Sequence, residues 1–151
     1  MNSLNLLFTN KILIAAVLGW LVAQVLKTFI HLYFTKSFDA ERLIGSGGMP
    51  SSHSATVCAL STASGINHGL HSFEFAVTTI FAIVVMYDAI GVRRETGIQA
   101  KILNEMMEIF DEMNKKISTQ DKLKELVGHT PLQVLAGAVL GIVIACIVMN
   151  S

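Results

Sequence analysis

The residues best suited to chemistry lie in one short string, GSGGMPSSHSA, from Gly45 to Ala55. Its glycines let the backbone fold closely around a ligand, and Pro50 suits a first helical turn because it lacks the N–H that would be unsatisfied there. The N–H groups of that turn, with the hydroxyls of Ser51 and Ser52, can hold phosphate oxygens, and His53 adds a group that titrates near neutrality. The string predicts an anion site, although a glycine turn before a capped helix would carry the same residues.

A second candidate segment runs from Asp88 to Gly97, where an apolar stretch ends and Arg93 and Arg94 begin. Two guanidinium groups can bind a phosphate, but arginine pairs beside a membrane also serve topology and lipid headgroups. A carboxylate at this boundary is costly unless it is paired. Asp88 is therefore expected to bridge to Arg93, Arg94 or Lys27 and so to orient an anion site.

A third segment, from Gly128 to Gly137, opens the last apolar stretch. Thr130, a following proline and Gln133 fit a capping box, so a helix is predicted to start at Thr130 with His129 just before its positive end. That end disfavours imidazolium, and neutral imidazole is the form that attacks as a nucleophile. A lone interfacial histidine is the alternative.

The elements that must position these residues are membrane helices. Of the 151 residues, 52% are hydrophobic before glycine is counted and 15% are charged, and the mean hydropathy is +0.58. Soluble domains reach only about 45–50% apolar residues with glycine included. Eleven basic residues balance eleven acidic ones, so no nucleic-acid partner is indicated. We expect an all-α integral membrane bundle, one domain over 1–151, with four spans at about 12–34, 51–70, 74–92 and 130–149.

A charged segment, 93–127, separates the last two spans. Its apolar residues recur at steps of three and four, the period of an amphipathic helix lying against the membrane or the bundle. A solvated linker helix with one packed stripe is favoured over a partner-binding role. The stripe consists of Ile98, Ile102, Met106, Ile109, Met113 and Ile117.

Four crossings bring the three candidate segments to one membrane face. The loop after the first span and the segment 93–127 share that face and hold nine of the eleven Lys and Arg residues, whereas Lys11 lies opposite and Lys27 snorkels within a span. The positive-inside rule makes this face cytoplasmic, in what we expect to be a bacterial cell membrane. An amide cradle, cationic side chains and two histidines then converge, as phosphoryl transfer through a histidine nucleophile requires.

These residues resemble motifs of the type-2 phosphatidic acid phosphatase superfamily, which includes the vanadium haloperoxidases, and most closely its small divergent membrane branch. The string PSSH at 50–53 is similar to the Pro-Ser-Gly-His motif of that superfamily. His129 and Gln133 resemble the end of its Ser-Arg-x5-His-x3-Asp motif, with Gln in place of Asp. The similarity runs from Lys27 to Gly137.

The remaining motif, Lys-x6-Arg-Pro, is kept in part. Lys27 resembles its lysine, but residues 34–35 are Phe-Thr instead of Arg-Pro, and Leu123 stands where the arginine before the histidine is expected. Arg93 and Arg94 lie in a GVRRETG string that the divergent branch shares. They are the candidates to supply the missing charges.

The resemblance implies a metal-independent membrane phosphatase acting on a lipid phosphomonoester, of phosphatidylglycerophosphate or phosphatidic acid type, at the cytoplasmic face. His129 would attack phosphorus to give a phosphohistidine, and His53 would protonate the leaving oxygen and then activate water. Gln133 would orient the nucleophile, with Asp88 or Glu125 as the carboxylate that replaces the family's aspartate. No cofactor is expected. The groups expected to bind phosphate are Lys27, Gly48, Ser51, Ser52, Arg93 and Arg94.

Two other functions stay open. A non-catalytic membrane protein would bind phosphorylated lipids, or assemble as a homo-oligomer through Gly137 and Gly141, whose GxxxG spacing suits helix packing. A divalent-metal phosphotransferase would instead rely on carboxylates. Its ligands would be Asp88, Glu95, Glu105 and Asp111. The histidines and cysteines expected to be structural are His31, His68, His71, Cys58 and Cys146.

Overall fold

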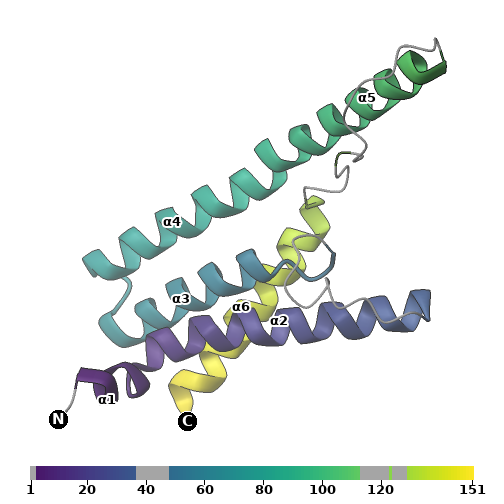
Figure 1. Cartoon of the computed structure of the whole chain (residues 1–151). Coiled ribbons are helices and arrows are strands. Elements are labelled where there is room, and N and C mark those ends of the chain that lie inside the picture. Colours follow the sequence, from purple (N-terminus) through teal and green to yellow (C-terminus); the bar gives the residue numbers. More distant parts are fainter. Residues whose placement is uncertain (1–2, 37–47, 113–122, 124–128) are drawn as a thin grey trace.

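The computed structural model describes residues 3–36, 48–112, 123 and 129–151, and the regular structure of these residues is entirely helical. Its long apolar helices confirm the prediction of an all-α membrane bundle. Figure 1 shows the six helices in order. They are α1 (Ser3–Phe8), α2 (Lys11–Thr35), α3 (Ser52–His68), α4 (Phe73–Ile90), α5 (Val92–Glu112) and α6 (Pro131–Asn150).

Four of the helices begin at a side-chain cap. In each case a Ser, Thr or Asn oxygen accepts a hydrogen bond from the backbone N–H three residues later, which satisfies one of the four N–H groups that a helix start leaves open. The short polar residues between the apolar stretches therefore fix where the helices start. The caps are Asn10 for α2, Ser51 for α3, Ser72 for α4 and Thr130 for α6.

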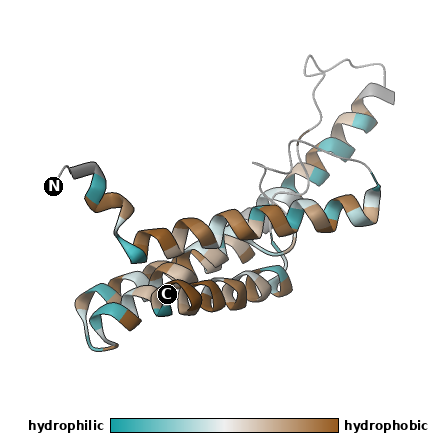
Figure 2. Cartoon of the chain, turned by 90° about the horizontal axis from the view of Figure 1, so that it is seen from below, coloured by the Kyte–Doolittle hydropathy of each residue, from teal (hydrophilic) through white to brown (hydrophobic). Residues whose placement is uncertain are grey.

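Three helices in the described part of the chain are long and apolar enough to cross a membrane: α2, α4 with its continuation into α5, and α6. The 25 residues of α2 and the 20 of α6 reach about 37 and 30 Å at 1.5 Å per residue, enough for a hydrocarbon core of about 30 Å. Figure 2 shows hydrophobic residues along much of α2 and α6. Of the four expected spans, the one at 51–70 is not among them, because α3 has 17 residues and many small polar ones.

Helix α3 lies inside the bundle, in contact with α2, α4 and α6. Ten of its 17 residues are buried, against two of the 18 in α4. Ala59 and Ala63 pack with Ala15 of α2 and Ala145 of α6 in one buried cluster. Small side chains let helices approach closely, and this favours an interior place for α3.

Gly137 and Gly141 form the closest helix contact, between α6 and α3. A Cβ at Gly137 would overlap the carbonyl oxygen of Ser51, and a Cβ at Gly141 would overlap that of Ala55. The GxxxG pair therefore serves packing within the chain. The expectation that it would join two copies is wrong, because α3 already occupies this face.

The direction of the helices follows from their contacts. Helix α4 runs antiparallel to α3, since Cys58 contacts Met86 and Ser61 hydrogen-bonds to Thr79 at 2.8 Å. Helix α6 runs parallel to α3, because its successive glycines meet successive turns of α3. Both α3 and α6 consequently start at the end of the bundle where α4 finishes.

Helix α5 continues from α4 and projects past that end, as the last turns of α2 also do (Figure 1). Its buried positions are Gly97, Ala100 and Asn104, whereas Ile98 and Ile102 are about half exposed. The expectation that the apolar stripe packs against the bundle is therefore wrong for the described residues, whereas a contact with the membrane stays a prediction. Of this stripe, Met113 and Ile117 lie outside them, as does most of the charged segment beyond Glu112.

Candidate active site

The PSSH string forms the start of α3. Ser51 is the N-cap, and its Oγ accepts the Ser54 N–H at 3.4 Å. Pro50 precedes the cap, so its expected place in the first helical turn is wrong by two residues. Ser51 and Ser52 are both buried, and the Ser51 N–H donates to the Gln133 carbonyl at 3.0 Å. The starts of α3 and α6 are thus joined by a backbone hydrogen bond.

A capping box starts α6, as predicted. The Gln133 N–H donates to Thr130 Oγ1 at 3.4 Å, and the Thr130 N–H donates to Gln133 Oε1 at 3.0 Å. His129 precedes the cap and is 4% exposed. Its N–H donates to the Ala89 carbonyl at 3.1 Å, which ties it to the end of α4.

The side chain of His129 is held by the same amide oxygen. His129 Nδ1 lies 3.2 Å from Gln133 Oε1. Because this oxygen also takes the Thr130 N–H, it acts as an acceptor, and Nδ1 must carry the proton when the bond forms. The imidazole then presents Nε2 as a lone pair, the form a nucleophile requires.

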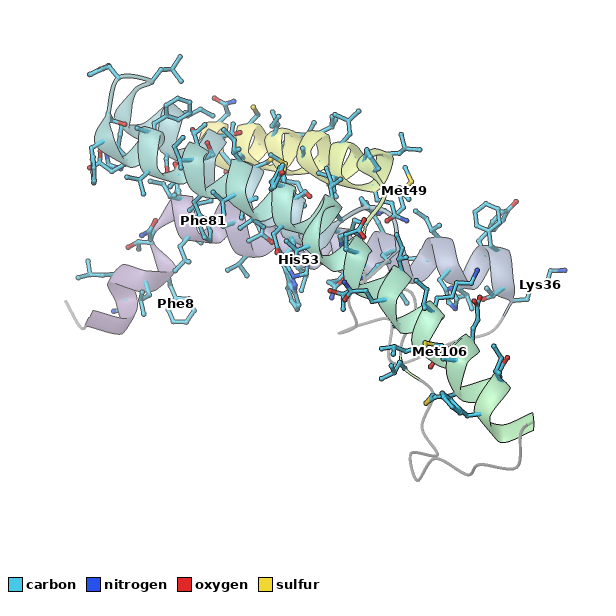
Figure 3. All side chains as sticks on the ribbon, turned by 90° about the horizontal axis from the view of Figure 1, so that it is seen from above. Phe8, Lys36, Met49, His53, Phe81 and Met106 are labelled. Carbon is cyan, nitrogen blue, oxygen red and sulfur yellow. The ribbon has the colours of Figure 1, made fainter. Side chains whose placement is uncertain are left out.

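His53 faces His129. The two ring centroids are 6.2 Å apart with the planes tilted by 57°, and His53 is half-buried in the first turn of α3. Figure 3 labels His53 within the bundle, while Lys36 and Met106 lie on segments that project past it. This separation is short enough for both imidazoles to reach one phosphoryl group bound beside the pair.

Lys27 of α2 is the lysine predicted to bind phosphate. It is 3% exposed, so the expectation that it snorkels to the membrane surface is wrong. Gly48 lies against it with φ of +86°, and a Cβ there would come within 2.9 Å of the lysine Cδ. The glycine supplies a conformation and a close approach that other residues lack. This buried lysine lies against the glycine that precedes the PSSH string, so it is a candidate to bind an anionic group there.

The other predicted residues are less closely defined. Asp88 is half-buried beside Ala89, the residue that accepts the His129 N–H. The side chains of Arg93 and Arg94, and Glu125 as a whole, lie outside the described residues. The carboxylates proposed as metal ligands do not gather in the described ranges, where no cluster of three or more His, Cys, Asp or Glu residues forms.

Three groups at this end were not predicted from the sequence. The Ala89 carbonyl holds the backbone of His129. Asn104 of α5 donates to the Leu123 carbonyl and accepts the Leu123 N–H, both at 2.9 Å, six residues before His129. Ser54 Oγ is fully buried and has no hydrogen-bond partner in the described part of the chain. Two of these contacts involve backbone atoms, which carry no sequence signal.

Two of the remaining histidines lie away from this group. His68 hydrogen-bonds to Asn67 at 3.1 Å, and His71 packs against Gly69, both in the connection from α3 to α4 at the other end of the bundle. His31 lies on α2, one turn beyond Lys27. The expected separation of His68 and His71 from His53 agrees with this arrangement.

The fold and composition define an integral membrane protein built from helices. A family model described as the Divergent PAP2 family matches residues 8–144. The chain therefore belongs to the divergent PAP2 family, as its motifs indicated. It is 39% identical over 150 residues to YuiD of Bacillus subtilis (strain 168), described as an uncharacterized membrane protein; the match covers 93% of this chain and 95% of that protein. No solved structure matches the chain.

Proposed function

We propose that the chain is a membrane phosphatase that hydrolyses a lipid phosphomonoester through a phosphohistidine. The observation that carries the proposal is the pair of facing histidines, 6.2 Å apart, with His129 held in one tautomer by Gln133. Membership of the divergent PAP2 family supports phosphatase-type chemistry. The site lies at the end of membrane helices, the depth at which lipid phosphates occur.

In the first step His129 Nε2 attacks phosphorus and the bond from phosphorus to the lipid oxygen breaks. His53 gives its proton to that oxygen, which leaves as an alcohol. The Nδ1–H bond to Gln133 remains and keeps the ring oriented. The product of this step is a phosphohistidine at His129 and a neutral His53.

In the second step His53 takes a proton from water, and the hydroxide formed attacks the phosphohistidine. The bond between phosphorus and nitrogen breaks, inorganic phosphate leaves, and both histidines return to their starting states. Buried Lys27 and the N–H groups at the start of α3 stabilise the charge on the phosphoryl oxygens. Ser51 and Ser52 are buried at that start, and the arginines of 93–94 are candidates to add charge. Asp88 would help to orient these cations.

The site is proposed to face the cytoplasm of a bacterial membrane. The segments on this side contain nine of the eleven Lys and Arg residues of the sequence, and positive residues favour the cytoplasmic side. Phosphatidylglycerophosphate and phosphatidic acid are the substrate classes proposed. A cysteine introduced at Thr130 and labelled from outside intact cells would contradict this orientation.

A phosphate-release assay tests the activity. The purified chain in lipid vesicles should release phosphate from these lipids with EDTA present, vanadate should inhibit the release, and His129→Ala should abolish it. His68→Ala is the matched control, because this histidine ends α3, at the other end of the helix from His53. Undiminished release by His129→Ala would exclude the mechanism.

Gln133 favours a second candidate, a protein that binds phosphorylated lipid without turnover. A neutral amide orients the nucleophile but does not stabilise its cation, as a carboxylate would. This candidate predicts saturable binding of phosphatidic acid with no phosphate release. Its binding should be weakened by Lys27→Met and unchanged by His129→Ala.

A further inference from the structure

The bulky apolar face of α5 contacts no other helix in the described part of the chain. Within the described helices α5 packs only against α4, from which it continues. Ile98, Ile102, Met106 and Ile109 are 45–57% exposed. Figure 3 shows Met106 on the part of α5 that projects beyond the bundle. An apolar strip of this length in water would be costly.

This face continues the lipid-facing side of α4. Ile80, Val84 and Tyr87 are exposed at steps of four and three along that span. Tyr87 and Ile98 are eleven residues apart, close to three turns of 3.6 residues, so they share one side of a continuing helix. The Gly91 N–H still bonds to the Tyr87 carbonyl at 2.9 Å, which keeps the helices in register.

The opposite side of the same rod is the covered one. Ala82 and Ala89 are buried on α4, and Ala100 follows Ala89 after another eleven residues. One turn further, Asn104 holds Leu123 by two hydrogen bonds. The chain's own contacts thus occupy one side of α5, and its apolar residues lie on the other.

We propose that α5 lies in the boundary between headgroups and acyl chains, with this apolar face against the lipid. The 18 residues of α4 already span about 27 Å, so α5 begins at the membrane surface. At Gly91 the backbone has φ of −88° and ψ of −83°, which departs from ideal helix near −63° and −42°. The proposal requires the helix to turn at this glycine in the membrane, so that the apolar face of α5 meets the lipid.

Two features favour lipid over a second copy of the chain. Ile98 and Ile109 are eleven residues apart over three turns, the spacing of a straight helix, whereas a left-handed coiled-coil seam repeats every 3.5 residues. Glu95, one turn into α5, lies on the same side and is exposed. A carboxylate is tolerated at headgroup depth but disfavoured in a packed helix seam.

Charge indicates which lipids matter. Helix α5 contains five acidic and three basic residues, so attraction to anionic headgroups does not drive its binding. Burial of the apolar face in the lipid drives the binding of α5 instead. The contact is therefore expected in neutral vesicles and in vesicles with anionic lipid alike.

Site-directed spin labelling of the full chain in vesicles tests the proposal. In a Cys58→Ala, Cys146→Ala background, single cysteines replace Ile98, Ile102 or Ile109, and control cysteines replace Lys101 or Glu108, which lie off the apolar face. Labels at the three isoleucine positions should collide more often with oxygen than with a water-soluble nickel chelate. Labels at the two charged positions should show the reverse order, in phosphatidylcholine with or without phosphatidylglycerol.

Two results would overturn the proposal. Nickel accessibility at the isoleucine positions equal to that at the charged positions would place the face in water. Spin–spin broadening at those positions, absent at the charged ones, would show that a second copy covers the face. A second measurement applies if the cysteine-free chain does not fold. In a Trp20→Phe background, brominated lipid should quench the fluorescence of the tryptophan in Ile102→Trp more strongly than that of the tryptophan in Lys101→Trp. Catalysis plays no part in either readout.

Discussion

Helices α3 and α5 differ in which of their side chains are buried and which are exposed. Small residues of α3, such as Ala59 and Ser54, are buried among three other helices, whereas the large apolar residues of α5, such as Ile102, are exposed. In lipid there is no hydrophobic force to drive large apolar side chains together, so close packing selects small ones for the interior. Side-chain size, more than hydropathy, decides which helix supplies the buried start of the site.

The largest effect on stability is expected from a bulky side chain placed in the contact between α6 and α3. Gly141→Leu would place its side chain on the Ala55 backbone, and overpacking of this kind costs about 3 kcal/mol or more. The thermal midpoint of the purified chain in detergent should fall sharply. Val143→Leu on the lipid-facing side of α6 is the control and should leave the midpoint unchanged. Equal midpoints for both variants would contradict an interior α3.

Lys27→Met should lower kcat/KM for a lipid phosphomonoester about 100-fold, as the loss of one stabilising donor does in other enzymes. The variant removes a charge that is 3% exposed and leaves a chain of similar length. Lys27→Arg should retain part of the activity. Phosphate-release kinetics measure both, and equal rates for Lys27→Met and wild type would remove the lysine from the site.

Gln133→Glu should raise kcat about tenfold, which corresponds to an activation free energy lower by about 1.4 kcal/mol. Glutamate keeps the capping box, because Glu and Gln serve equally at this position, and its charge stabilises the cation formed at His129. Gln133→Ala loses the contact with His129 Nδ1, and its kcat should fall below that of the wild type. A slower Gln133→Glu enzyme with unchanged thermal midpoint would argue against a cationic phosphohistidine.

The smallest effect concerns the link between α5 and the site. Asn104→Ala removes both hydrogen bonds to Leu123, a loss of about 1 kcal/mol, and kcat should fall several-fold with KM unchanged. Ile102→Ala, on the opposite face of α5, is the matched control and should not change kcat. A KM effect without a kcat effect would show that Asn104 does not position His129.

Local features of the fold could be predicted from the sequence. The capping box of Thr130 and Gln133 involves neighbouring residues, so its geometry follows from the order of residue types. The PSSH string predicted a helix start, but the first helical residue is Ser52, because Ser51 takes the cap and excludes Pro50. Hydropathy predicted the apolar helices correctly, and α3, with 17 residues and many small polar ones, is the one expected span that its length and composition do not single out.

Non-local features could not be predicted. A GxxxG pair indicates close packing without naming the partner helix, which here is α3 of the same chain. The period of α5 located its apolar side but not what that side contacts. Buried Lys27 lies against Gly48, twenty-one residues away, and His129 is tied to α4 by a carbonyl group. Both contacts depend on the tertiary fold alone.

The central claim is that His129 and His53 act in turn on one phosphoryl group. Its most direct test is to trap the intermediate with a radiolabelled aryl phosphate, whose leaving group needs no acid, followed by an alkaline quench that preserves phosphohistidine. His53→Asn should accumulate alkali-stable, acid-labile label at His129, and His129→Asn should accumulate none. Label retained by His129→Asn, or absent from a folded His53→Asn chain, would contradict the account.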